Sequence, residues 1–155
     1  MKKHLLIVLL LLPLVCNAQS YVQVGPAIYP MSGLGADLIG DFQVAHFTPK
    51  FSLGVGAMAF ANTFYSDQEP NLNKRITSAY LAPQVGLHYS FTSKFDCYLR
   101  GGAGLIAIKA TGNKISSGRF MYNGVFGVGL SIWSHVGFYA EGGLPFSSVG
   151  VRLAL

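Results

Sequence analysis

The chain alternates between large apolar residues and small or polar ones, and this alternation limits its fold more than any other feature. The clearest example is the stretch from Ser78 to Phe91, in which the odd positions are apolar or aromatic and the even positions are mostly small or polar. A period of two indicates a β-strand with one apolar face. In a soluble sheet, the second face would carry charged residues to meet water. Here it carries mainly Gly, Ser, Ala and Tyr, so we expect it to line a narrow barrel while the apolar face meets lipid.

The same alternation recurs along the chain and predicts eight strands. A sheet that crosses a membrane has to close, because an open edge in hydrocarbon would leave backbone groups unpaired. The expected fold class is therefore all-β, an eight-stranded antiparallel up-and-down transmembrane β-barrel. The predicted strands cover about residues 21–29, 37–46, 51–59, 78–91, 95–105, 120–132, 136–141 and 149–155.

Composition favours the same fold. Charged residues make up 11% of the chain, whereas ordinary soluble proteins have about 25%. Hydrophobic residues make up 51%, and Gly occurs 19 times. A soluble barrel with an apolar cavity, such as a lipid carrier, is the alternative, and it would reverse the two faces of every strand.

The N-terminus has the layout of a secretory signal peptide. A basic start at residues 1–4 precedes an apolar stretch from Leu5 to Val15 that is too short to span a bilayer as a helix. Cleavage is expected after Ala18, giving a signal peptide at residues 1–18 and a barrel domain at 19–155. An alternative is a lipoprotein acylated at Cys16, although Val15 stands where such sites carry a small residue.

Removal of the signal peptide leaves Cys97 as the only cysteine, so an intramolecular disulfide is excluded. His and Cys residues at metal-ligand spacing are absent from the sequence, so neither a metal nor another cofactor is expected. Nine of the eleven Lys and Arg residues remain against six Asp and Glu, a net charge near +3. An exported chain without a basic stripe is not expected to bind nucleic acid.

A pentamer is repeated between strands. FTPKF at Phe47–Phe51 returns as FTSKF at Phe91–Phe95, 44 residues later, and a looser version, IWSHV, occupies Ile132–Val136. In an up-and-down barrel, every second connection lies on the same side of the membrane. We therefore expect short turns at one interface and an aromatic belt above them. The expected belt consists of Phe47, Phe51, Phe91, Phe95 and Trp133. A hairpin in a soluble sheet is the alternative interpretation of this repeat.

Lys50 and Lys94 of the repeat are expected to reach toward water on the periplasmic side. The longer connections then face outward, and they are rich in Gly, Asn, Ser and Pro. They are expected at Pro30–Gly35, Ser66–Arg75, Thr111–Gly118 and Leu144–Ser147.

Three features of the chain are typical of one family of membrane proteins: its dyad alternation, its Gly-x-Gly repeats at Gly54–Gly56 and Gly127–Gly129, and its final strand SVGVRLAL. In these features the chain resembles small eight-stranded outer-membrane barrels of the OmpA transmembrane-domain and OmpX kind. The resemblance implies a monomer in the Gram-negative outer membrane, in contact with its lipids and with the barrel-insertion machinery during biogenesis. The chain ends in Leu155 where the commonest form of the insertion signal has an aromatic residue.

Four charged residues fall on inward positions, and charges inside a narrow barrel must pair because an isolated one is costly to bury. These residues are Asp41, Arg100, Glu141 and Arg152. Glu141 and Arg152 lie on the last two strands, so we expect them to pair with each other. The cluster resembles the lumenal ion pairs of OmpA-type barrels and is interpreted as a plug. A gated pore that uses the same pairs is the alternative.

Basic residues gather at the ends of the outward loops, where they would hold the phosphates of lipopolysaccharide. The candidates are Lys74, Arg75, Lys109, Lys114 and Arg119. The alternative is that they are ordinary solvated loop charges.

His88 and Ser90 prompt a comparison with lipid A deacylases, which are barrels that use a His-x-Ser pair with an acidic partner. The alternation places both residues on the inward face, beside a periplasmic turn, whereas deacylation needs them on the lipid face. We therefore expect no enzymatic activity and a structural or interaction role. A lipid A-modifying enzyme, a narrow channel and an accessory barrel of a secretion complex remain as alternatives.

Overall fold

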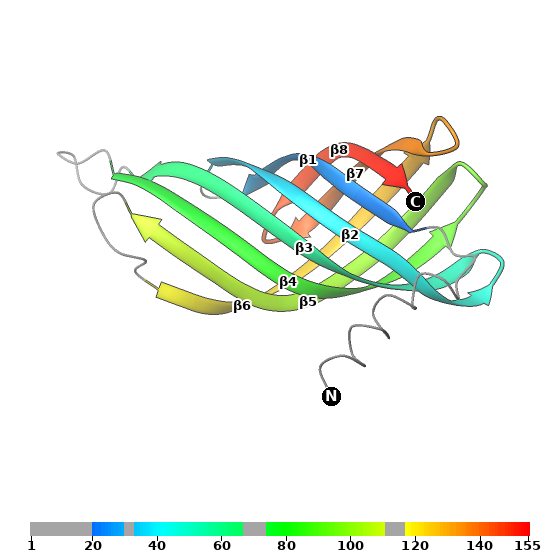
Figure 1. Ribbon diagram of the computed structural model, residues 1–155, viewed down its shortest axis with the longest axis horizontal. Helices are drawn as coiled ribbons and strands as arrows, with labels where there is room; N and C mark the ends of the chain where they lie inside the picture. Colours follow the sequence, from blue (N-terminus) through cyan, green and yellow to red (C-terminus); the bar gives the residue numbers. More distant parts are fainter. Residues whose placement is uncertain (1–19, 30–32, 67–73, 111–116) are drawn as a thin grey trace, which may run out of the picture.

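A computed structural model describes residues 20–29, 33–66, 74–110 and 117–155 as a closed, all-antiparallel barrel of eight strands. The strands follow one another around the barrel in chain order, and β1 pairs with β8 to close it (Figure 1). The fold class predicted from the alternation is confirmed. The strands are β1 Tyr21–Tyr29, β2 Gly33–Thr48, β3 Phe51–Ser66, β4 Lys74–Ser90, β5 Phe95–Ala110, β6 Ser117–Ser131, β7 Val136–Leu144 and β8 Ser147–Ala154. No helix of these residues is long and apolar enough to cross a bilayer.

The strand faces follow the alternation. On β4, Val85 is 55% exposed and Leu87 is 40% exposed, whereas Gln84 between Pro83 and Val85 is 5% exposed. Pairing preserves this pattern across the sheet, because Val55, Val85 and Gly101 lie side by side on neighbouring strands. Large apolar residues thus cover the outside of the barrel, whereas its interior holds small and polar residues together with a cluster of buried apolar ones, such as Phe60 and Ile106.

The turns at Pro49–Lys50, at residues 91–94 and at residues 132–135 lie at one end of the barrel. We call this the turn end, and the opposite end the loop end. Both ends of the described chain also lie at the turn end, where the Leu155 amide donates to the Ser20 carbonyl at 2.9 Å. The signal peptide predicted at residues 1–18 lies outside the described residues.

The barrel wall is uneven. Strands β1, β7 and β8 have 9, 9 and 8 residues, whereas β2 to β6 have 15 to 17. At about 3.4 Å per residue and a tilt near 40°, β7 covers about 23 Å along the axis and β3 about 42 Å. The short strands therefore just match an apolar band of about 25 Å, while the outer ends of β3 to β6 extend well past them. Figure 1 shows this one-sided extension.

All four expected loops are too long. The residues that belong to strands instead are Gly33–Gly35, Ser66, Lys74–Arg75, Ser117–Gly118, Leu144 and Ser147. Their backbone pairing simply continues beyond the apolar band, as in the pair formed by Tyr65 and Arg75. Residues 30–32, 67–73 and 111–116, which carry the rest of the first three predicted loops, lie outside the described residues.

Candidate functional site

Charged and polar side chains fill the interior in the half of the barrel nearer the turn end. Arg100 on β5 forms an ion pair with Glu141 on β7, and both side chains are almost completely buried. Glu141 also accepts hydrogen bonds from the Tyr98 hydroxyl at 3.0 Å and the Ser148 hydroxyl at 3.2 Å. Arg100 and Tyr98 belong to β5 and Ser148 belongs to β8, so the carboxylate of Glu141 on β7 joins three strands.

The same guanidinium reaches the opposite wall. Arg100 Nη1 lies 3.7 Å from Asp41 Oδ2 on β2, and His88 Nε2 on β4 lies 3.0 Å from the same oxygen. The Arg100 guanidinium also lies over the Tyr98 ring, 4.5 Å from its centroid. Asp41, His88, Arg100 and Glu141 thus form a buried chain of charges and imidazole across the barrel.

A second ion pair lies closer to the turn end. Arg152 Nη2 on β8 lies 2.5 Å from Asp96 Oδ1 on β5 and donates to the Ser131 hydroxyl at 3.0 Å. Its guanidinium covers the Tyr21 ring at 4.5 Å from the centroid. Asp96 is a member of the lumenal network that the sequence interpretation did not include.

The expected pairing of Glu141 with Arg152 is wrong. In the β7–β8 register, Glu141 lies opposite Ser148, and Arg152 lies opposite Gly137, four residues further toward the turn end. Strand tilt brings residues of distant strands to the same height, so each charge finds its partner across the lumen. All four predicted cluster residues are buried, but they divide between two networks.

Glycines provide the space for these networks. A Cβ added at Gly129 would collide with the Arg152 guanidinium and would lie 2.9 Å from Asp96 Oδ1. A Cβ at Gly54 would collide with Asp41 and lie 2.9 Å from His88 Nε2. One glycine of each Gly-x-Gly repeat, Gly54 or Gly129, therefore marks a position where a charged side chain from another strand enters the lumen.

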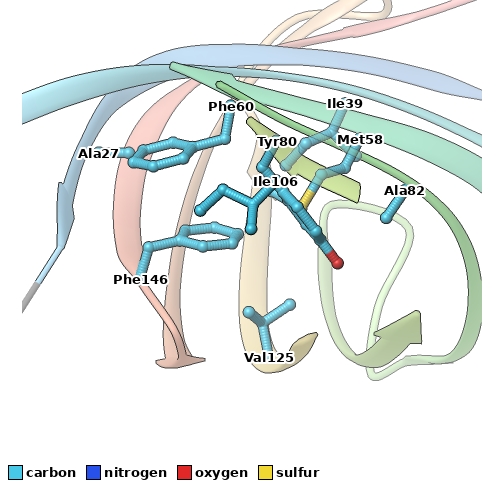
Figure 2. Close-up of a cluster of buried hydrophobic side chains, with 9 residues drawn as sticks. All are labelled: Ala27, Ile39, Met58, Phe60, Tyr80, Ala82, Ile106, Val125 and Phe146. Carbon is cyan, nitrogen blue, oxygen red and sulfur yellow. The ribbon is translucent and has the colours of Figure 1, made fainter. Parts of the chain in front are cut away.

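An apolar layer fills the interior nearer the loop end (Figure 2). Its rings include Phe60 on β3 and Phe146 in the β7–β8 connection, which stack with centroids 5.3 Å apart. Phe146 is fully buried. The layer consists of Ala27, Ile39, Met58, Phe60, Tyr80, Ala82, Ile106, Val125 and Phe146. Between the two layers, the Tyr139 hydroxyl donates to Asp37 Oδ1 at 2.7 Å.

The repeated pentamer is explained by its threonine as well as by its aromatic residues. The Thr48 hydroxyl accepts from the amides of Lys50 at 3.3 Å and Phe51 at 3.0 Å. Thr92 does the same in the second copy, with Lys94 at 3.2 Å and Phe95 at 3.0 Å. Each threonine thus closes its turn with two hydrogen bonds.

The third turn keeps the backbone pattern of the second turn. Its Ile132 and Trp133 amides both donate to the Val136 carbonyl at 3.0 Å, as the Phe91 and Thr92 amides donate to the Phe95 carbonyl.

The aromatic side chains predicted as a belt all lie at the turn end. Phe47, Phe91, Phe95 and Trp133 are exposed on the outer surface, and Phe51 is partly exposed. The ring centroids of Phe47 and Phe51 are 5.5 Å apart, and so are those of Phe91 and Phe95.

Of the five residues predicted as a basic rim, the structure describes the side chains of two, and these two lie on opposite faces of the wall. Lys109 lies on the outward face of β5 with Leu105 and Ala107, and it is exposed. Arg119 is also exposed, but its position on β6 alternates with the outward Phe120, so it lies on the lumenal side of the wall. Lys74 and Arg75 begin β4, and Lys114 lies outside the described residues.

A groove of about 890 Å³ crosses the outer surface of the wall near the loop end. Its floor is a row of alanines paired across neighbouring strands, Ala36, Ala61, Ala79 and Ala107. On the side nearer the turn end, this row is bordered by three exposed leucines, Leu38, Leu81 and Leu105. On the other side, Lys109 pairs with Thr77, whose hydroxyl lies 3.3 Å from that of Thr63. The outer surface therefore changes from apolar at the groove to polar and cationic just beyond it, toward the loop end.

His88 is 3% exposed and lies inside the barrel, with Asp41 as its acidic neighbour. Ser90 follows it on the same face and lines a cavity at the turn end. Among the described residues, no group of three His, Cys, Asp or Glu side chains is placed to hold a metal ion. Cys97 is a half-buried free thiol.

These features define a class, the small eight-stranded transmembrane β-barrel. No protein-family model matches the chain, and no curated protein matches it either. A designed transmembrane β-barrel is similar in structure, with a TM-score of 0.55 at 15% identity, covering 88% of this chain and 95% of the other.

Two natural proteins share the fold. Ail, the attachment invasion locus protein of Yersinia pestis, solved with the heparin analogue sucrose octasulfate, gives a TM-score of 0.54 at 10% identity over 90% of this chain and 97% of its own. Neisserial surface protein A gives a TM-score of 0.53 at 13% identity, over 89% of this chain and 96% of its own. At these identities the similarity establishes the fold alone.

Proposed function

We propose that the chain is a monomeric outer-membrane barrel that acts through its outer surface, in a structural or interaction role. After loss of residues 1–18, its turn end would face the periplasm and its extended wall would face outward. The apolar outward faces and the turn-end aromatic residues support this placement, because aromatic side chains favour the membrane interface. During biogenesis, its proposed partner is the barrel-insertion machinery. After insertion, its proposed partners are the lipids of the outer membrane.

The observation that carries this proposal is the filling of the lumen. The polar layer places Tyr98 and Arg100 at 2% exposure, and the apolar layer places Phe146 at 0%. An ion crossing the barrel would have to displace a buried ion pair and then pass an apolar cluster. We propose that the lumen does not conduct, which leaves the outer surface to carry the function.

Lipopolysaccharide is the proposed ligand of that surface. Lys109 lies on the outward face of β5, directly beyond the apolar groove whose floor includes Ala79 and Ala107. Acyl chains would lie against the groove, and a lipid phosphate would meet the lysine, since a cation just outside an apolar band favours anionic headgroups. Arg75 belongs to the neighbouring strand, two residues beyond Thr77, the partner of Lys109. The remaining rim candidates, Lys74, Lys114 and Arg119, are not assigned a contact with the lipid in this proposal.

We also propose that the chain is not an enzyme. His88 Nε2 is 3.0 Å from Asp41 inside the barrel, so its imidazole lies on the opposite face of β4 from the lipid-facing Leu87 and Tyr89. A lipid acyl bond outside the barrel would lie beyond its reach.

Binding of purified lipopolysaccharide to the refolded barrel in detergent tests the proposal. Lys109→Gln should weaken binding by at least about tenfold, and the loss should shrink as salt is raised. Arg119→Gln is the matched control, because its side chain lies on the other face of the wall, and it should change binding much less. Equal effects of the two substitutions, or none from either, would contradict a site on the outward face.

A further inference from the structure

A cavity of about 460 Å³ opens at the turn end of the barrel. Arg152 and Asp96, which form the second ion pair, contribute to its wall, together with the buried polar residues Gln43 and Ser52. Lys50 and His46, both exposed, also line it. The cavity is therefore polar at its buried side and cationic at its edge. We call it the turn-end vestibule.

The ion pair at the buried side leaves binding groups unused. Arg152 is 2% exposed and Asp96 is 6% exposed. Within the described part of the chain, Arg152 Nε and Asp96 Oδ2 make no hydrogen bond to a protein group. A buried donor and a buried acceptor without partners are unfavourable, so a ligand that satisfies both gains binding energy. The wall of the vestibule thus holds one N–H donor and one carboxylate acceptor without a partner. Both atoms are buried, so an occupant reaches them only when the side chains that cover them shift.

The charges around the vestibule do not cancel. The Asp96 carboxylate is balanced by Arg152 at 2.5 Å. Among the described residues that line the vestibule, this leaves the Lys50 ammonium at the edge as a formal charge without an ion pair. A single negative charge on the ligand would complement this lysine. A multiply charged inorganic anion would instead meet the Asp96 carboxylate, which offers it no donor and repels it.

We propose that the vestibule binds the C-terminal end of a short peptide. The terminal carboxylate would pair with Lys50, while the last peptide unit supplies an N–H to Asp96 Oδ2 and a carbonyl oxygen to Arg152 Nε. A peptide unit carries this donor and this acceptor together, which neither a fatty acid nor inorganic phosphate does. In the orientation proposed above, the peptide would come from the periplasm. Binding itself depends only on the vestibule, so its test is independent of orientation and of lipopolysaccharide binding.

Titration calorimetry on the detergent-solubilised mature barrel tests the proposal, with tri-alanine, its C-terminal amide, free alanine and inorganic phosphate as probes. Tri-alanine should bind, and the amide should bind at least about tenfold more weakly because it lacks the charge that meets Lys50. Free alanine and phosphate should also bind more weakly. Phosphate or free alanine binding as tightly as tri-alanine would overturn the assignment to a peptide terminus, and so would the absence of tri-alanine binding at millimolar concentration.

The repeated turn supplies a matched pair of variants. Lys50 and Lys94 occupy the same position in FTPKF and FTSKF, and both are exposed. Lys50 lines the vestibule, whereas Lys94 is not among its lining residues. Lys50→Met should weaken tri-alanine binding by at least about tenfold, and Lys94→Met should leave it unchanged. An equal loss in both variants, or no loss in Lys50→Met, would overturn the proposed site.

Discussion

Replacement of Glu141 by Gln would test the buried network directly. Glu141 is 6% exposed and is the closest carboxylate to Arg100, whose other acidic neighbour, Asp41, is 3.7 Å away and shared with His88. Gln keeps the size of the side chain and an oxygen for Tyr98, but it removes the negative charge. Loss of one member of a buried pair typically costs about 3–5 kcal/mol, because the other charge stays buried.

The effect should be large enough to measure by urea unfolding of the barrel reconstituted in lipid vesicles. With a urea dependence of about 1–3 kcal/mol per molar, a cost of about 3 kcal/mol lowers the midpoint by at least about 1 M. Addition of Arg100→Met should restore part of the loss, because it removes the uncompensated charge.

Glu141→Gln combined with Arg152→Met is the matched control. Arg152 pairs with Asp96 rather than with Glu141, so this second substitution should add its own cost instead of restoring stability. Equal rescue by the two second substitutions, or a single-variant cost below about 1 kcal/mol, would refute the assigned pairing.

Two further predictions concern the turns and the faces. Thr48→Val and Thr92→Val each remove two hydrogen bonds to backbone amides. Each should therefore lower the unfolding free energy by about 0.5–1.5 kcal/mol, additively, whereas a cost in only one turn would argue against a shared role. In a Cys97→Ala background, cysteines at Val85 and Leu87 should react with a lipid-phase probe and a cysteine at Gln84 should not. The opposite labelling would indicate a soluble barrel with an apolar cavity.

The alternation was sufficient to predict the fold, because every strand in the membrane repeats the same two-residue rule. Val85 and Gln84 fall on the faces that their types predict. Strand lengths were not predictable in the same way. The chain continues to pair at Gly33, Lys74 and Ser117, where small or charged residues resemble loop sequence, because hydrogen bonding to a neighbouring strand outweighs local preference.

The site was only partly predictable. The two-residue alternation shows which positions of a strand face inward, so the burial of Asp41 and Arg100 could be inferred from sequence. Their partners depend on strand tilt and stagger, which a single sequence does not reveal, and Glu141 was therefore assigned to Arg152. Phe146 was missed for another reason. It follows Pro145 in a predicted loop, and no periodic pattern signals that a loop residue enters the lumen.

The central claim is that the barrel acts through its outer surface because its lumen is filled, and planar-bilayer recording of the purified protein tests it most directly. With Arg100 paired to Glu141 and Phe146 stacked on Phe60, the reconstituted barrel should show no steady current across a range of voltages. Steady, stepwise currents from the wild-type protein would contradict the account and identify a narrow channel instead.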